Sequence, residues 1–121
     1  MIATGLDRLL AEPGRLSGRR YGLLAHGASL SAGLVPAHLA LAAAGLTPAR
    51  LFGPEHGYYG VEQDMVAAGD ERDPWTGAAI VSLYGAQETT LRPRAEAFDG
   101  LDLLVVDLQD VGSRYYTYAA T

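Results

Sequence analysis

Apolar residues follow two different patterns along the chain, helical spacing and short unbroken runs. Leucines at helical spacing before Pro13-Gly14 predict an amphipathic helix over residues 2–12. A second helix is predicted from Pro36 to Gly45, because proline suits the first turn of a helix and glycine its end. We expect the buried face of this second helix to carry Val35, Leu39, Ala42 and Leu46.

Four short apolar runs predict β-strands at residues 20–25, 49–52, 79–84 and 101–108. Within the last run, residues 103–106 are all apolar, so we expect both faces of this strand to be covered, as in a parallel sheet. A helical turn is predicted over residues 93–98. Residues 53–78 are polar and Gly-containing, and we expect a long loop without regular structure, a type of segment that is often functional.

The alternation of strands with helices predicts an α/β domain with a mostly parallel sheet. The chain has 121 residues and no internal repeat or linker, so we expect a single domain over residues 1–121. Its last residues, 115–121, are typical of the start of a helix with no cap, Gly or Pro after it. We therefore expect the domain to be truncated at its C-terminus.

Composition excludes several classes of chemistry and partner. The chain has no Cys, and all nine of its basic residues are Arg, which excludes a thiol nucleophile and a Schiff-base lysine. Its net charge of −5 argues against nucleic acid as a partner. No apolar run approaches the ~20 residues of a membrane span, and no signal peptide is recognisable. We expect a cytoplasmic chain with no membrane partner, and an exported longer form stays an open alternative.

Polar side chains follow every predicted strand. In open α/β sheets, ligands bind beyond the carboxyl ends of the strands, so these residues are expected to converge on one edge. They are His26 after the first strand, Glu55 and His56 after the second, Tyr84 at the end of the third, and Asp107, Gln109, Asp110 and Arg114 after the fourth.

The densest group of chemically useful residues is Gly53-Pro54-Glu55-His56-Gly57. A rigid Gly-Pro turn with a flanking Gly fixes the backbone around a carboxylic acid and an imidazole, as a positioned acid/base pair requires. The alternative is a solvated Glu55 in a tight turn, with His56 capping the loop.

Two carboxylates and a guanidinium follow the fourth strand. Asp107 and Asp110 can accept sugar hydroxyls or hold a divalent cation, and Arg114 can pair with a substrate carboxylate. The alternative is that Asp107 caps backbone amides and Asp110 pairs with Arg114. Hard cations usually need more oxygen ligands than this segment offers, so no metal is predicted. Tyrosines are candidates for a sugar-stacking platform, namely Tyr58, Tyr59, Tyr115, Tyr116 and Tyr118.

Two aromatic or titratable residues have a structural interpretation. His38, inside the second predicted helix, is expected to be a structural or surface histidine, and Trp75 is expected to pack the long loop down. No glycine-rich nucleotide fingerprint, P-loop or serine-hydrolase elbow is present, so we expect no nucleotide or other cofactor.

A set of ordered motifs resembles the N-terminal part of a bacterial family, DUF1343, which includes exo-β-N-acetylmuramidases of the NamZ type. The resemblance runs from about Tyr21 to the last residue. The motifs are Leu51-Phe52-Gly53-Pro54-Glu55-His56-Gly57, Asp73 with Thr76-Gly77, Ser82-Leu83-Tyr84-Gly85, Asp107-Leu108-Gln109-Asp110-Val111-Gly112, and Arg114-Tyr115-Tyr116-Thr117-Tyr118 with Thr121.

The resemblance implies a Rossmann-like three-layer domain, followed in the family by a second subdomain that is absent here, with the active site in the cleft between them. It also implies release of terminal N-acetylmuramic acid from peptidoglycan fragments, with Glu55 as the catalytic residue. From the residue types themselves we expect His56 to assist Glu55 in catalysis, and we expect substrate binding by His26, Asp107, Asp110, Arg114, Tyr116 and Tyr118. The expected partners are a peptidoglycan-derived sugar and the missing subdomain, without which little activity is expected. The alternative is a noncatalytic sugar-binding or interaction module.

Overall fold

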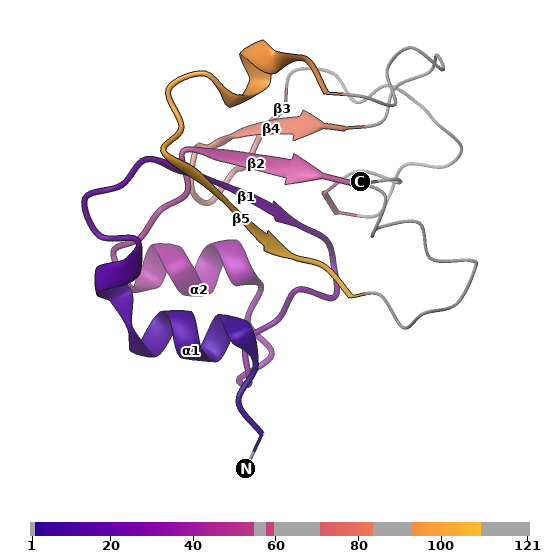
Figure 1. The fold of residues 1–121 in the computed structure, drawn as a ribbon. Coiled ribbons are helices and arrows are strands. Elements are labelled where there is room, and N and C mark those ends of the chain that lie inside the picture. The colour runs from indigo at the N-terminus through magenta and orange to yellow at the C-terminus, as the bar shows by residue number, and fades with distance from the viewer. Residues whose placement is uncertain (1, 55–57, 60–70, 84–92, 110–121) are drawn as a thin grey trace.

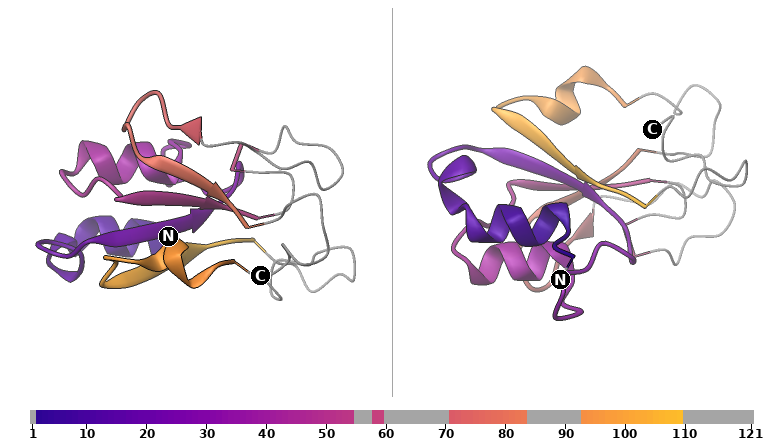
Figure 2. Two further views of the ribbon diagram at one scale, coloured as in Figure 1. Left: turned by 90° about the horizontal axis from the view of Figure 1, so that it is seen from above. Right: turned by 60° about the horizontal axis from the view of Figure 1, so that its bottom comes forward.

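The computed structural model describes residues 2–54, 58–59, 71–83 and 93–109. Five strands form one sheet in the order β3-β4-β2-β1-β5. The helices α1 and α2 cover one face of the sheet, and the short helix η3 lies against the other face (Figures 1 and 2). The predicted three-layer α/β class is confirmed.

Four of the strands run parallel and set the position of the candidate site. They are β1 (Tyr21–Ala25), β2 (Arg50–Gly53), β4 (Ala79–Ser82) and β5 (Leu103–Asp107). Ala25 pairs with Asp107, and Leu24 pairs with both Phe52 and Val106. All four carboxyl ends therefore meet at one edge of the sheet. The strand β3 (Glu71–Arg72) pairs antiparallel with β4, so the expected loop over residues 53–78 contains a strand too short to show a periodicity.

The first helices begin and end where local chemistry dictates. The helix α1 (Gly5–Ala11) starts with a capping box in which Thr4 and Asp7 bind each other's backbone amides. It is followed by the 3₁₀ turn η1 (Pro13–Arg15). The helix α2 (Ala37–Ala43) follows Pro36, and just beyond its end lies Gly45, whose φ of 76° suits glycine. The 3₁₀ turn η3 (Ala95–Phe98) occupies the predicted helical turn.

The buried face of α2 differs from the predicted one. Ala37, His38 and Leu41 are buried, whereas Val35 is 41% exposed and precedes the helix; of the four predicted residues, Leu46 is buried and lies beyond the end of α2. The prediction counted only apolar residues. It was wrong because the face of α2 that meets the sheet includes a polar residue, His38, which finds a hydrogen-bonding partner in the interior, the Tyr58 hydroxyl.

Two apolar clusters hold the layers together. On the α1 and α2 side, Leu23, Leu41 and Leu51 are fully buried. On the η3 side, the ring of Phe52 stacks on that of Phe98, with centroids 5.1 Å apart and planes at 12°. The strands β1, β2 and β4 thus contribute side chains to both faces, as expected of a sheet between layers.

Two packing predictions fail. Leu104 and Val106 of β5 are 38% and 58% exposed, so one face of this edge strand is uncovered within the described residues. Trp75 is 68% exposed and therefore does not pack the loop down. Within the same residues, no helix combines the length and apolar character needed to cross a bilayer.

Candidate functional site

The ends of β1 and β5 bring His26 and Asp107 side by side. Ala25 pairs with Asp107 in the sheet, so His26 follows β1 at the point where β5 ends. The side chain of His26 lies within hydrogen-bonding distance of two backbone N–H groups, with Nε2 3.0 Å from Gln109 N and Nδ1 2.9 Å from Ala28 N. A neutral imidazole has one acceptor nitrogen, so only one of the two is a hydrogen bond in a given tautomer.

Ser29 fixes the turn that follows β1. Its hydroxyl accepts a hydrogen bond from the His26 backbone N–H at 3.0 Å and donates one to the backbone carbonyl of Asp107. The side chain is buried, and its own N–H donates to the His26 carbonyl at 2.9 Å. A single serine therefore ties the His26 turn to the end of β5, a role that the sequence did not reveal.

Burial and the charge interaction between His26 and Asp107 have opposing effects on the pKa of each residue. Burial lowers the pKa of His26, and the charge of Asp107 partly offsets this effect. Burial also raises the pKa of Asp107, and His26 partly offsets that shift. The carboxyl of Asp107 thus keeps its proton to a higher pH than an exposed aspartate does, which suits a group that exchanges protons or accepts sugar hydroxyls.

Asp107→Asn is expected to raise the melting temperature at pH 7. The folded-state pKa lies above the unfolded-state value, so ionised Asp107 destabilises the fold at any pH above the folded pKa. Asparagine removes that ionisation. Below pH ~3.5 the carboxyl is protonated in both states, and the gain should vanish. Thermal melts of the 121-residue chain at pH 7 and pH 3, with the exposed Asp99→Asn as control, test this; an unchanged or lower value at pH 7 contradicts it.

A second polar cluster joins α2 to the residues after β2 and β3. The Tyr58 hydroxyl lies 2.9 Å from His38 Nδ1, and His38 Nε2 lies 3.5 Å from Asp73 Oδ1. Asp73 in turn accepts hydrogen bonds from the Tyr59 hydroxyl and from the backbone N–H of Thr76, the latter at 2.6 Å. These five residues, His38, Tyr58, Tyr59, Asp73 and Thr76, are called the His38 cluster below. The sequence singles out all five residues, but for separate reasons, and it does not predict that they form one cluster.

A small hollow of about 230 Å³ separates the His26 turn from the His38 cluster. Its walls include Pro36, Tyr58 and Tyr59, together with His26 and His38. Tyr58 is buried, so the prediction that it belongs to an open sugar-stacking platform is wrong. Tyr59 is 39% exposed. The hollow thus offers one accessible aromatic ring beside two imidazoles.

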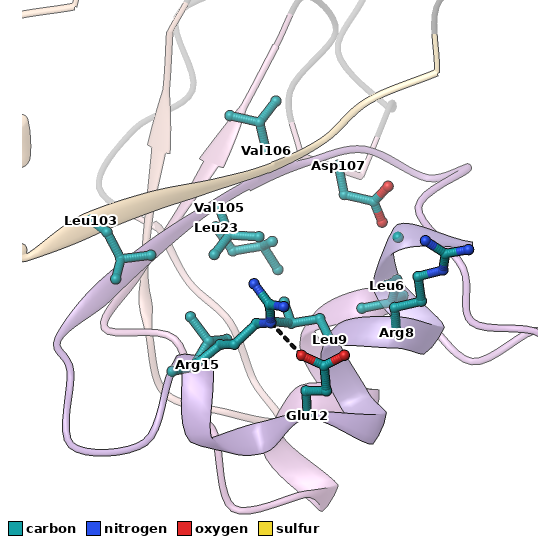
Figure 3. Close-up of a pocket in the computed structure, with 12 residues that line it drawn as sticks. Leu6, Arg8, Leu9, Glu12, Arg15, Leu23, Leu103, Val105, Val106 and Asp107 are labelled. Atoms are coloured by element: carbon teal, nitrogen blue, oxygen red, sulfur yellow. Dashed lines mark hydrogen bonds and ion pairs between the residues drawn. The ribbon is translucent and has the colours of Figure 1, made fainter. Parts of the chain in front are cut away.

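A larger hollow of about 580 Å³ lies between α1 and the β5 edge (Figure 3). Leu6, Leu9, Leu23, Leu103 and Val105 supply most of its wall. Its polar groups are an Arg15–Glu12 ion pair, with Nε and Oε2 2.5 Å apart on the α1 side, Arg8, and Asp107 at one end. Apart from Asp107, it holds none of the predicted site residues, so the polar edge of the sheet is the better candidate site.

Most of the predicted site residues lie outside the described residues, and their roles stay predictions. They are Glu55, His56, Tyr84, Asp110, Arg114, Tyr116 and Tyr118. Pro54, which precedes Glu55, is fully buried at the end of β2. Of the predicted residues, the structure brings together His26, Asp107 and Gln109. Across the part of the chain that the structure describes, no three His, Asp or Glu side chains gather as metal ligands would.

Comparison with known proteins identifies relatives of nearly the whole chain. The sequence model of a family described as "Exo-beta-N-acetylmuramidase NamZ, N-terminal" matches residues 21–121. The peptidoglycan β-N-acetylmuramidase NamZ of Bacillus subtilis (strain 168) is 36% identical, over 99% of this chain and 29% of its own length.

Two crystal structures of DUF1343 family proteins from Bacteroides fragilis NCTC 9343 share the fold. One superposes with a TM-score of 0.81 at 32% identity, covering 98% of this chain and 29% of that one. The other has a TM-score of 0.71 at 26% identity and covers 98% and 28%. The chain thus spans less than a third of the length of each of these relatives.

Proposed function

This chain belongs to the family of exo-β-N-acetylmuramidase NamZ N-terminal domains, and we propose that it forms one wall of the active site of a glycosidase. The proposed reaction is the release of terminal N-acetylmuramic acid from the non-reducing ends of peptidoglycan fragments. The similar protein of B. subtilis is a peptidoglycan β-N-acetylmuramidase, which supports a sugar substrate of this class.

One structural observation supports this proposal most strongly. The carboxyl ends of β2, β1 and β5 lie next to one another in the sheet. Glu55 comes two residues after β2, His26 directly after β1, and Asp107 is the last residue of β5. A candidate acid thus follows β2 in the sequence, and a second carboxyl ends β5, on the two strands that flank β1, which supports a two-carboxylate hydrolysis at this edge.

Each residue has a proposed role. Glu55 acts as the general acid on the leaving sugar oxygen, and His56 sets its protonation state. Asp107 or Asp110 is the partner carboxylate or binds sugar hydroxyls, while Arg114 pairs with the lactyl carboxylate of muramic acid. His26 binds the substrate at the same edge of the sheet, and Tyr116 and Tyr118 stack on the sugar.

A noncatalytic sugar-binding module is the second candidate. It is favoured by the exposed ring of Trp75, which meets the half-exposed Tyr59 edge to face with centroids 6.3 Å apart. Exposed aromatic faces suit sugar rings whether or not a bond is cleaved.

Release of sugar separates the two candidates. We expect the longest form of the protein that its gene encodes to release free N-acetylmuramic acid from a muramic acid–glucosamine disaccharide, measured by chromatography. The 121-residue chain alone is expected to be at least about a hundredfold slower, because misplacement of a substrate by even ~1 Å has that effect.

The controls use other ligands. A disaccharide without the lactyl group should be a poor substrate, and NAD and ATP should not bind. Binding of the muramic acid disaccharide without cleavage by the longest form supports the noncatalytic module. Equal turnover by the short and long forms contradicts an active site divided between two subdomains.

A further inference from the structure

The order of the strands reverses between β1 and β5. From β1 the chain continues through β2 to β4 on one side, and β5 then joins the sheet on the other side of β1. The connections change faces as well, because α2 packs on one face of the sheet and η3 on the other (Figures 1 and 2). In open α/β sheets, ligands bind in the crevice at such a reversal, beyond the carboxyl ends of the strands. His26 and Asp107 lie at this crevice.

The Ser29 hydroxyl joins the two strand ends across the crevice. Ala25 and Asp107 are the last paired residues of β1 and β5. One step further along β1, the hydroxyl accepts a hydrogen bond from the His26 backbone N–H at 3.0 Å and donates one to the Asp107 backbone carbonyl. The hydroxyl therefore takes the place of a rung of the sheet. It links a donor of one strand end to an acceptor of the other and holds them farther apart than a direct hydrogen bond would.

Ser29 is itself fixed to its surroundings. Its backbone N–H donates to the His26 carbonyl at 2.9 Å, and its carbonyl accepts from the N–H of Ala37, at the start of α2, at 2.8 Å. The residue is 4% exposed, whereas His26 and Asp107 are half-buried. A ligand in the crevice can therefore contact His26 and Asp107, while the Ser29 hydroxyl is closed off from solvent.

The bridge acts on the same two residues whose side chains are expected to bind the sugar. It binds the backbone of His26 and of Asp107, so a change in the bridge changes the separation of their side chains. The His26 ring also faces the β5 end, with Nε2 3.0 Å from Gln109 N. The hollow of about 230 Å³ borders both His26 and Ser29 and leaves room beside the pair.

We propose that Ser29 is a positioning residue for the substrate-binding pair His26 and Asp107: its hydroxyl, inserted between the ends of β1 and β5, sets the separation at which the imidazole and the carboxyl meet the sugar. The inference rests on the proposed function and deepens it. Ser29 touches no substrate itself.

Three substitutions of Ser29 test the hydroxyl. For the longest gene-encoded form acting on the muramic acid disaccharide, Ser29→Ala should raise KM by about 10- to 100-fold, the range that hydrogen bonds to a charged group contribute. The kcat should change less than about threefold. Ser29→Thr keeps the hydroxyl and should keep KM within about threefold, since the hollow beside Ser29 has room for a methyl group. Ser29→Cys offers a weaker donor and acceptor, should give an intermediate KM, and replaces Ser29→Ala if that variant does not fold.

Two further variants separate positioning from stability. Ser31→Ala is the matched control, because the Ser31 hydroxyl accepts from the Val35 N–H at 3.3 Å within the same loop. It should lower the melting temperature slightly and leave KM unchanged. Combining Ser29→Ala with Asp107→Asn should raise KM by less than the product of the two single effects, because Ser29 acts through Asp107.

The titration of His26 reports on the bridge without any activity. Burial holds the pKa of His26 below its ordinary value in the wild type. Loosening the strand ends in Ser29→Ala should admit water and move this pKa up toward the ordinary value. Ring ¹⁵N spectra of the 121-residue chain measure the change, and Ser31→Ala should leave the pKa where it is.

The outcomes distinguish this inference from the proposed function. If the wild type releases muramic acid but Ser29→Ala keeps its KM and only melts earlier, the serine is structural and the inference is wrong. If Ser29→Thr raises KM as much as Ser29→Ala does, the hydroxyl is not what matters, and the inference is wrong again. An unchanged His26 titration in Ser29→Ala overturns it whatever the activity. If the wild type shows no glycosidase activity while the titration shifts as expected, the proposed function fails and takes the inference with it.

Discussion

Glu55→Gln is expected to lower turnover of the muramic acid disaccharide by about 10²- to 10⁴-fold, the usual contribution of general acid assistance. Glutamine keeps the shape of the side chain and loses only the transferable proton, so binding of the sugar should be nearly unchanged. The measurement is kcat and KM of the longest gene-encoded form, with binding followed separately by calorimetry.

A substrate with a good leaving group identifies the role of Glu55. A nitrophenolate needs no protonation as it departs, so a nitrophenyl muraminide should restore much of the lost rate in Glu55→Gln. Asp99→Asn serves as the control, because Asp99 is exposed and precedes the amino end of β5, whereas the candidate site lies at the carboxyl ends of the strands. Wild-type turnover by Glu55→Gln on the disaccharide would show that Glu55 is no acid. An equal loss on both substrates would favour a nucleophilic or structural role instead.

The fold was predictable where the physics is local. The runs at residues 20–25 and 101–108 contain β1 and β5 within two residues, because a short apolar run bounded by turn residues indicates a strand whether one face or both are covered. The strand β3 was not predictable, since its two residues are charged and form a strand only through their pairing with β4. The exposure of Val106 also depends on what lies next to the edge of the sheet, and the apolar run over residues 103–106 does not specify that.

The candidate site was predictable in its position and not in its supporting contacts. Strand-end placement correctly brought His26 and Asp107 together, because parallel register is a property of the whole sheet. The burial of His38 depends on Tyr58 and Asp73, which are 20 and 35 positions away along the chain. A lone histidine inside an apolar helical pattern carries no information about such distant partners, so helical periodicity alone gave the wrong buried face for α2.

Phe52→Ala is expected to lower the free energy of unfolding by about 3–5 kcal/mol, a large part of the 5–15 kcal/mol that is typical of a domain. Phe52 is fully buried in β2, and its ring stacks on Phe98 of η3. The ring also lies against the backbone of Gly22, where an added Cβ would come within 2.5 Å of Cε2. Alanine therefore leaves a cavity between the sheet and η3 that the backbone of two strands cannot close.

Denaturant unfolding of the 121-residue chain measures this loss. Val106→Ala is the matched control, because Val106 is 58% exposed on β5 and its truncation should cost less than about 0.5 kcal/mol. Phe52→Leu should retain part of the stability, since leucine fills part of the space but cannot stack on Phe98. A loss below about 1 kcal/mol in Phe52→Ala would mean that η3 contributes little to the fold. The end of β2 would then be held mainly by the packing on the α1 and α2 side.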